Sequence, residues 1–213
     1  MGLYDIKPRF RQLLLPVADS LLWLHPDVIT LAGLMASGCA FLCIFYAVTR
    51  PWLLVLVPGF LFLRIGCNAL DGLVAQRSGK ARAFGEVLNE GADRIADVIL
   101  ILGLGITPWA SFRLATATLV AVFLSSYAGI LGKAVGVERQ YGGILGKADR
   151  MFWMGAVALV AWKVGLQPIR VLNLKFLSVF DLMLAIFLPF SMITLYQRIR
   201  KIQMSLKKIR PPQ

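Results

Sequence analysis

Long apolar runs restrict the folds open to this chain more than any other feature of its sequence. The runs PWLLVLVPGFLFL and VILILGLGI flank a polar stretch at residues 64–97. Of the 213 residues, 58% are hydrophobic, and the mean hydropathy is +0.73. Several runs approach the length of about 20 residues that crosses a bilayer as a helix, whereas barrel strands would alternate in polarity. We therefore expect an all-α integral membrane protein with a single domain over residues 1–213.

The apolar runs predict six transmembrane helices. They lie at about residues 28–48, 52–76, 83–104, 112–132, 151–164 and 176–196. Residues 1–26 mix charge with Leu and Trp, which favours an amphipathic interfacial arm interrupted near Pro16; a plain cytosolic arm is the alternative. Residues 197–213 form a basic tail that we expect to fray.

The net charge of +12 is spread between and after the apolar runs. This placement excludes a nucleic-acid-binding surface and instead indicates topology signals and contacts to anionic headgroups or phosphates. The N-terminal arm, the second and fourth interhelical loops and the tail hold sixteen Lys and Arg, whereas the other three loops hold five. The positive-inside rule therefore predicts that both termini are cytoplasmic.

The polar stretch at residues 64–97 is predicted to form two facing helices, and we call it the seam. Arg64, Asn68 and Asp71 share one helical face, and residues 78–80 form the turn. The second helix carries a stripe made of Glu86, Asn89, Glu90, Asp93 and Asp97. Charges inside a membrane cost several kcal/mol each, so these groups must pair, bind cations or line water.

Two interpretations of the seam stay open. Arg64 and Arg94 can bridge carboxylates and lock the helices together, but the acids outnumber such buried cations. Clustered carboxylate and amide oxygens are ligands that suit Mg²⁺ or Mn²⁺. The small residues Gly72, Ala75 and Gly85 allow either tight helix packing or the approach of a flat group such as a nucleotide.

The seam resembles the signature of the CDP-alcohol phosphatidyltransferase family, Asp-x2-Asp-Gly-x2-Ala-Arg-x8-Gly-x3-Asp-x3-Asp. The spacing fits throughout: the four Asp positions fall on Asn68, Asp71, Asn89 and Asp93, the small positions on Gly72, Ala75 and Gly85, and the Arg position on Gln76, next to Arg77. The stretch PDVIT at 26–30 is similar to an element before the family's first span. NALDG, LNE and GKADR resemble a bacterial branch, which implies the bacterial inner membrane.

The resemblance implies a metal-dependent transfer from a CDP-linked lipid, typically CDP-diacylglycerol, to an alcohol, with release of CMP. It places Mg²⁺ or Mn²⁺ on Asn68, Asp71, Asn89 and Asp93, and makes Asp93 the general base. The nucleotide would lie along Asp71, Gly72, Ala75, Gln76, Arg77 and Gly85. Homodimerisation is a further implication.

The departures from the signature weaken a two-metal site. Two Asp positions are Asn, whose oxygen can coordinate a metal without bringing charge, and the Arg position is Gln. Glu86, Glu90 or Asp97 are possible substitute ligands, each within about one helical turn of the signature face. One metal instead of two, or nucleotide binding without catalysis, are the alternatives.

Basic residues after the fourth span supply a candidate acceptor site. Arg139, Lys147 and Arg150 are predicted on the seam's side of the membrane, where they suit a phosphorylated alcohol such as glycerol phosphate or inositol phosphate. Ordinary positive-inside charge explains them equally well.

Two other functions compete with the enzyme. One is a degenerate relative that binds nucleotide or lipid without turnover. The other is an ion transporter, which we disfavour because its polar groups would spread across the depth of the membrane.

Overall fold

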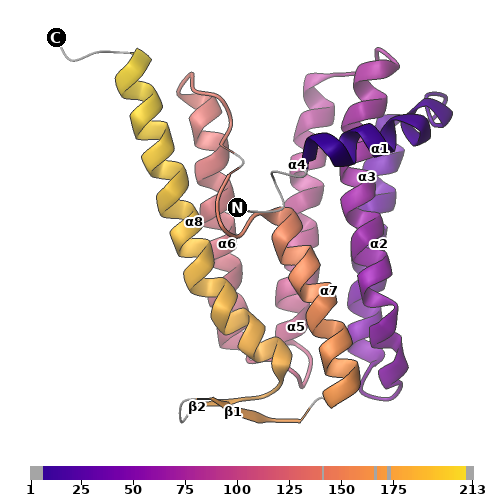
Figure 1. Cartoon of the computed structure of the whole chain (residues 1–213), viewed down its shortest axis with the longest axis vertical. Coiled ribbons are helices and arrows are strands. Elements are labelled where there is room, and N and C mark those ends of the chain that lie inside the picture. The colour runs from indigo at the N-terminus through magenta and orange to yellow at the C-terminus, as the bar shows by residue number, and fades with distance from the viewer. Residues whose placement is uncertain (1–6, 141, 166, 172–173, 210–213) are drawn as a thin grey trace.

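The computed structural model describes residues 7–140, 142–165, 167–171 and 174–209. Within them the chain is mainly helical, and its long helices run side by side as a bundle (Figure 1). The elements are α1 (Lys7–Ser20), α2 (Pro26–Tyr46), the 3-10 turn η2 (Pro51–Val55), α3 (Val57–Arg77), α4 (Ala83–Asp97), the π-helical turn η3 (Val98–Leu102), α5 (Gly103–Gly105), α6 (Phe112–Ala134), α7 (Lys147–Val164), β1 (Ile169–Val171), β2 (Leu174–Phe176) and α8 (Val179–Ile209).

Among the described residues, four helical segments are long and apolar enough to cross a membrane. They are Pro26–Tyr46, Pro51–Arg77, Phe112–Ala134 and Val179–Lys208. The two remaining predicted spans are also helical, as the continuous α4–η3–α5 path and as α7, but the first carries the acidic stripe and the second begins with charged residues. A mainly helical membrane fold is therefore confirmed, whereas apolarity alone supports four spans among the described residues rather than six.

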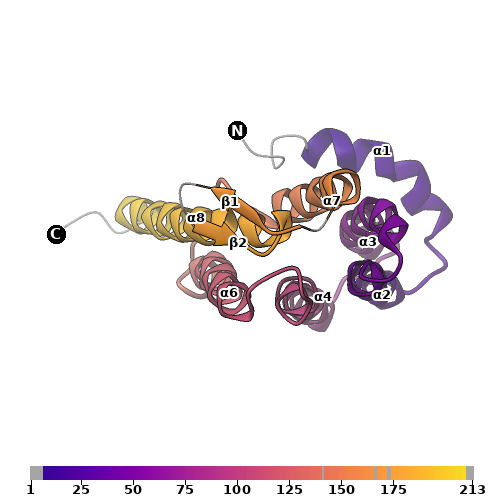
Figure 2. The same cartoon turned by 90° about the horizontal axis from the view of Figure 1, so that it is seen from below.

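Helix α1 lies across the bundle and packs on α3, on the same side as α7 (Figures 1 and 2). The predicted interruption at Pro16 is wrong, because α1 runs through it. A proline inside a helix leaves the carbonyl four residues earlier without its partner. That residue is Gln12, which is exposed, so the helix continues without burying an unpaired carbonyl.

The C-terminal third departs from the sequence prediction in two places. Helix α8 does not end near residue 196 but continues to Ile209, so the described part of the basic tail is helical. Before it, β1 and β2 pair as a short antiparallel hairpin where the sequence indicated only a connecting loop. The hairpin lies at the end of the bundle opposite to α1 (Figure 1).

Apolar packing sets how the helices of the bundle lie against one another. The larger buried cluster draws on α2, α3, α6, α7 and α8, with Ile44, Leu61, Val122, Met154 and Leu184 among its members. Helix α2 packs closely on α3, and α6 packs on α8, while α7 contacts both α3 and α8 (Figure 2). The first residues of α7 therefore face the seam from across the bundle.

Candidate active site

Local sequence fixes the two helices of the seam. Helix α3 ends at Arg77, and Gly79 adopts a φ of 69°, a left-handed conformation that suits a residue just after a helix. Helix α4 then begins at Ala83, so the chain reverses within a few residues, as the sequence predicted. The turn brings the polar faces of α3 and α4 together.

Four seam side chains form a continuous hydrogen-bonded row between α3 and α4. Asn68 Nδ2 donates to Asn89 Oδ1 at 2.7 Å and to Asp93 Oδ1 at 3.3 Å. Asn89 Nδ2 donates to Asp71 Oδ1 at 3.5 Å. The two aspartates therefore face the same space and are linked through the two asparagines.

Thr30 is a site residue that the sequence analysis missed. Its Oγ1 donates to Asp71 Oδ2 at 2.8 Å, and both residues are buried. Helix α2 begins at Pro26, with His25 as its N-cap, which places Thr30 one turn into the helix and against α3. The signal was the PDVIT element, which was noticed only as a likeness to the family.

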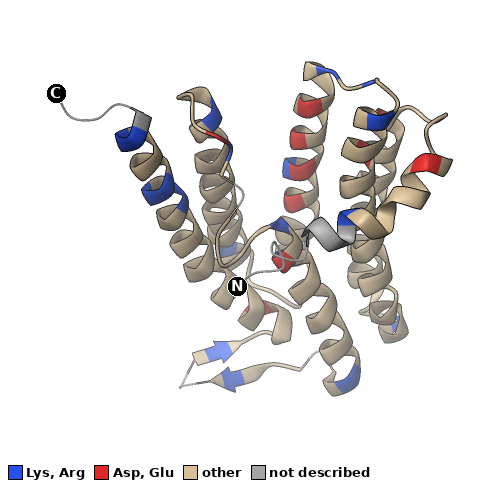
Figure 3. Ribbon diagram, turned by 45° about the horizontal axis from the view of Figure 1, so that its top comes forward, with Lys and Arg blue, Asp and Glu red and all other residues tan. Residues whose placement is uncertain are grey.

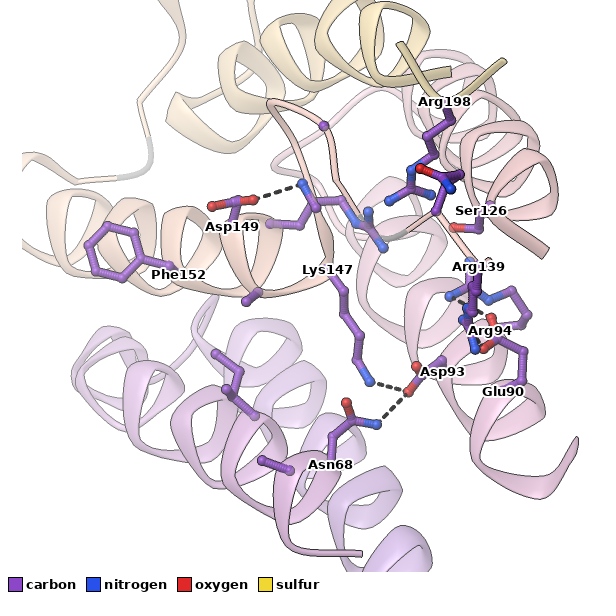
Figure 4. A pocket seen from close by; sticks show the side chains of 18 of the residues that line it. Asn68, Glu90, Asp93, Arg94, Ser126, Arg139, Lys147, Asp149, Phe152 and Arg198 are labelled. Atoms are coloured by element: carbon purple, nitrogen blue, oxygen red, sulfur yellow. Dashed lines mark hydrogen bonds and ion pairs between the residues drawn. The ribbon is translucent and has the colours of Figure 1, made fainter. Parts of the chain in front are cut away.

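Asp93 receives three donors on one oxygen. Arg64 Nη2 donates to its Oδ1 at 2.5 Å, Asn68 Nδ2 donates at 3.3 Å, and Lys147 Nζ also donates to that atom. Arg64 is fully buried in α3, and Gly33 of α2 makes room for it, since a Cβ there would lie 2.8 Å from Arg64 Nη1. Lys147 reaches Asp93 from the start of α7 (Figure 4).

The acids of α4 form a stripe along the helix (Figure 3), and those other than Asp93 are paired with basic residues. Glu86 binds Lys133 at 2.6 Å on the surface, where both side chains are more than half exposed. Glu90 pairs with Arg139 and, at 3.6 Å, with Arg94. The deepest pair joins Asp97 to Arg150 through both carboxylate oxygens, at 2.9 and 3.0 Å.

A cavity of about 380 Å³ opens beside the seam. Its lining includes the three predicted acceptor residues Arg139, Lys147 and Arg150, together with Asn68 and Asp93 from the seam. Figure 4 labels all of these except Arg150. Asp149 fixes the first turn of α7 by accepting a hydrogen bond from the Gly146 amide at 2.8 Å, which positions Lys147 at the rim.

Arg198 is a second residue that the sequence analysis missed. It lines the cavity from α8, donating to the carbonyls of Ser125 at 2.6 Å and Gly142 at 2.9 Å. It therefore ties α6 and the loop before α7 to α8. No sequence signal separates it from the other basic residues near the C-terminus, because they were assigned together to the tail.

The predicted nucleotide residues fall into two groups. Gly72 adjoins Asp71 on α3, and a Cβ at Gly72 would meet no atom within 4 Å, while Ala75 and Gly85 are partly exposed. The side chains of Gln76 and Arg77 instead contact α1, where Arg11 donates to Gln76 at 3.0 Å and Arg77 pairs with Asp19 at 2.6 Å. The structure thus places the small residues, but not these two long side chains, along the open face of the seam.

The ligand set fits one divalent cation. Among the described residues, no group of three or more His, Cys, Asp or Glu side chains is arranged to hold a metal. The row of Asn68, Asp71, Asn89 and Asp93 offers two carboxylates and two amides, and Mg²⁺ needs only one or two carboxylates when waters and substrate phosphates complete its shell. Two such ions would carry four positive charges against two carboxylates, and one of these, Asp93, already pairs with Arg64 and Lys147.

Comparison with known proteins tests the family resemblance. Residues 23–196 match the family described as CDP-alcohol phosphatidyltransferase. The chain is 35% identical over 160 residues to the inner membrane protein YnbA of Escherichia coli, covering 73% of this chain and 78% of that protein. It is 34% identical over 146 residues to the phosphatidylinositol phosphate synthase of Mycolicibacterium smegmatis, covering 64% and 63% of the two chains.

Solved structures share the fold. A crystal structure of Mycobacterium tuberculosis phosphatidylinositol phosphate synthase with CDP-DAG bound has a TM-score of 0.64 at 24% identity, covering 88% of this chain and 92% of that one. The crystal structure of the same enzyme in complex with manganese and citrate has a TM-score of 0.63 at 23% identity, covering 88% of each chain. The second of these structures holds manganese, so a divalent metal of the expected kind is found in a protein of this fold.

The family match covers most of the chain, and the relatives at 31–35% identity include named synthases of that family. The predictions of an enzyme, of membrane residence and of a role in phospholipid synthesis are therefore confirmed at the level of the family. This chain belongs to the CDP-alcohol phosphatidyltransferase family and is an integral membrane transferase of phospholipid biosynthesis.

Proposed function

We propose that this protein transfers a phosphatidyl group from CDP-diacylglycerol to the hydroxyl of a phosphorylated polar alcohol and releases CMP. The observation that carries the proposal is the row from Asp71 through Asn89 and Asn68 to Asp93, which borders a basic cavity at its Asn68 and Asp93 end. A site for a charged pyrophosphate and a site for an anionic acceptor thus lie next to each other.

The donor would bind along the open face of the seam. Gly72, Ala75 and Gly85 leave space for the cytidine, and Asn68, Asp71, Asn89 and Asp93 would hold the divalent cation. When bound, Mg²⁺ or Mn²⁺ offsets the negative charge of the pyrophosphate. Thr30 holds the Asp71 carboxylate in place through its hydroxyl.

The transfer is a displacement at phosphorus. The acceptor oxygen forms a bond to the β-phosphorus while the bridging P–O bond breaks, and CMP leaves with that electron pair. Asp93 would take the proton of the attacking hydroxyl, since it borders the cavity from which the acceptor comes. Arg64 and Lys147 keep this carboxylate oriented.

The acceptor would bind in the basic part of the cavity. Arg139, Lys147 and Arg150 line it, joined by Arg94 and Arg198. Among the described residues, the Nε atoms of Arg94 and Arg150 are buried without a hydrogen-bond acceptor, which supports an anionic group completing their shells. A phosphate on the alcohol meets this requirement better than a neutral hydroxyl does.

The same proposal includes the topology. The continuous α4–η3–α5 path and α7 would complete six crossings with the four apolar helices, as one domain in a bacterial inner membrane. Residues 1–26 would be the interfacial arm at the cytoplasmic surface and residues 197–213 the cytoplasmic tail, of which 1–6 and 210–213 lie outside the described residues. Two chains would associate as a homodimer.

One observation favours a second function, in which nucleotide or lipid binds without turnover. Asn68 and Asn89 hydrogen-bond to each other at 2.7 Å, so that part of the ligand set is satisfied internally. A degenerate relative would keep the fold and the cavity while losing the metal charge that the reaction needs.

Purified protein in lipid nanodiscs separates the two functions. The assay incubates it with CDP-diacylglycerol, Mn²⁺ and a panel of phosphorylated and plain polar alcohols, and measures CMP release. We expect release with a phosphorylated alcohol and a loss of about 1000-fold in Asp93→Asn, in the range for removal of a general base. The matched control is Asp19→Asn, an exposed acid of α1. Metal-dependent binding of cytidine nucleotide without CMP release would support the degenerate form.

A further inference from the structure

Lys147 brings a cation from a third helix into the seam. It is the first residue of α7, and its Nζ donates to the same Asp93 oxygen that Arg64 and Asn68 contact. Figure 4 shows the side chain extending from α7 along the cavity to Asp93, next to Asn68. Its side chain is only 21% exposed, compared with 58% for Lys133, so it is not an ordinary surface lysine.

The two cations on Asp93 differ in what they can reach. Arg64 is fully buried within α3 and is not among the residues that line the cavity, so its charge acts on Asp93 inside the bundle and not on a ligand in the cavity. Lys147 lines the cavity, and its ammonium group lies where the seam opens onto it. A ligand entering the site would therefore meet the charge of Lys147.

The number of carboxylates in the seam explains why a lysine ammonium can lie beside Asp93. The family signature has four aspartates where this chain has two aspartates and two asparagines, a loss of two negative charges. That loss equals the charge of one divalent ion, so the side chains of the row balance the charge of one fewer metal ion. Lys147 then supplies a single positive charge against Asp93 without any metal.

We propose that the Lys147 ammonium replaces a second divalent cation, so that the seam of this chain binds one metal ion and presents Lys147 as the other positive group to the donor pyrophosphate. The inference rests on the proposed function, because it assumes a pyrophosphate in the seam. It gives Lys147 a role toward the donor, at the edge of the acceptor pocket, that ordinary positive-inside charge does not predict.

Manganese stoichiometry tests the inference without depending on turnover. Full-length protein in nanodiscs with CDP-diacylglycerol and no acceptor is titrated with Mn²⁺, and electron paramagnetic resonance measures free Mn²⁺ and the coupling between bound ions. We expect one Mn²⁺ per chain and no coupling in the wild type. In the variant with Asn68→Asp, Asn89→Asp and Lys147→Gln we expect two Mn²⁺ per chain and a coupled spectrum.

Two further variants keep the test interpretable. Lys147→Arg retains the positive charge and should keep one Mn²⁺ per chain, and it should hold the donor more tightly than Lys147→Gln does at saturating Mn²⁺. Lys163→Gln changes a lysine at the opposite end of α7 and should behave as the wild type.

Three results would overturn the inference. The first is two coupled Mn²⁺ ions in the wild type, and the second is a donor affinity that Lys147→Gln leaves unchanged. The third is no Mn²⁺ binding in the wild type with donor present. CMP release measured on the same preparation distinguishes these failures from a failure of the proposed function, since release can persist while the stoichiometry is wrong.

Discussion

The two walls of the cavity are built in different ways. The seam wall, formed by α3 and α4, takes its polar residues from one contiguous stretch and joins them by hydrogen bonds between amides and carboxylates. The opposite wall collects Arg139, Arg150 and Arg198 from a loop, α7 and α8. These arginines bind backbone carbonyls or the outer acids of α4.

The difference indicates a division of labour along α4. Asp93 faces the seam, whereas Glu90 and Asp97, about one turn away on either side, pair with the arginines of the opposite wall. One helix can therefore present acids to a metal and anchor a basic pocket at the same time. An acid's partners, and not its position in the signature alone, predict which of the two roles it has.

The largest difference that we expect is between the Mn²⁺ affinities of the Asp71→Asn and Asp97→Asn variants. Asp71→Asn would leave one carboxylate in the row, and we expect Mn²⁺ affinity and activity to fall by roughly 100-fold or more, at the upper end of losses seen around metal sites. Asp97→Asn should instead lower stability by roughly 3 kcal/mol, because it breaks a buried ion pair, while Mn²⁺ affinity in the folded fraction stays within about threefold. Calorimetric Mn²⁺ titration and thermal unfolding provide the two measurements. Equal losses of Mn²⁺ affinity would make Asp97 a ligand.

The contiguous wall is also the part that the sequence could predict. Arg64, Asn68 and Asp71 share a face because of helical spacing, and the turn at 78–80 follows from its glycine, so both helices and their facing sides were expected. The row within the seam follows from this local geometry. Its contact with Thr30 does not, since α2 and α3 meet through packing that involves Gly33, and no local pattern fixes that register.

The opposite wall could be predicted only in part. Arg139, Lys147 and Arg150 stood out as basic residues predicted on the seam's side of the membrane, but their partners Glu90, Asp93 and Asp97 depend on how α7 and the preceding loop fold over α4. Arg198 was hidden in the tail because nothing in the sequence indicated that α8 extends past residue 196. These contacts depend on packing between segments that are distant in the sequence, and the spacing of apolar residues does not predict that packing.

Arg198 tests whether the opposite wall depends on long-range contacts. Arg198→Met removes the charge-assisted bonds to the Ser125 and Gly142 carbonyls, each bond to a charged group being worth about 1.5–3 kcal/mol. We expect the KM for the phosphorylated acceptor to rise about 30-fold, within that range, while Mn²⁺ affinity is unchanged. Steady-state kinetics with varied acceptor measure this. Arg200→Met, which changes an exposed neighbour on α8, is the control. An equal rise in KM in that variant would mean that Arg198 acts only through its positive charge and not through its two hydrogen bonds.

Thr30 tests the seam wall at a contact that comes from α2, outside the contiguous stretch. Thr30→Val removes the hydroxyl that donates to Asp71 at 2.8 Å and preserves the shape of the side chain. Losing one hydrogen bond of about 1 kcal/mol should weaken Mn²⁺ binding about fivefold. Thr30→Ser should restore it, because the hydroxyl returns. If Thr30→Val and Thr30→Ser had the same Mn²⁺ affinity, Thr30 would contribute packing at Asp71 and no hydrogen bond that matters for the metal.

The smallest expected effect concerns Glu86, which the sequence proposed as a substitute metal ligand. In the structure Glu86 and Lys133 form an ion pair in which the side chains are 53% and 58% exposed. Exposed ion pairs contribute little to stability. Glu86→Gln should therefore leave the unfolding temperature nearly unchanged and alter Mn²⁺ affinity and the rate of CMP release by no more than about twofold. A fall in Mn²⁺ affinity comparable to that of Asp71→Asn would instead mean that α4 turns Glu86 into the seam when metal binds. That outcome would erase the distinction between the two walls, because an acid outside the hydrogen-bonded row would then serve the metal.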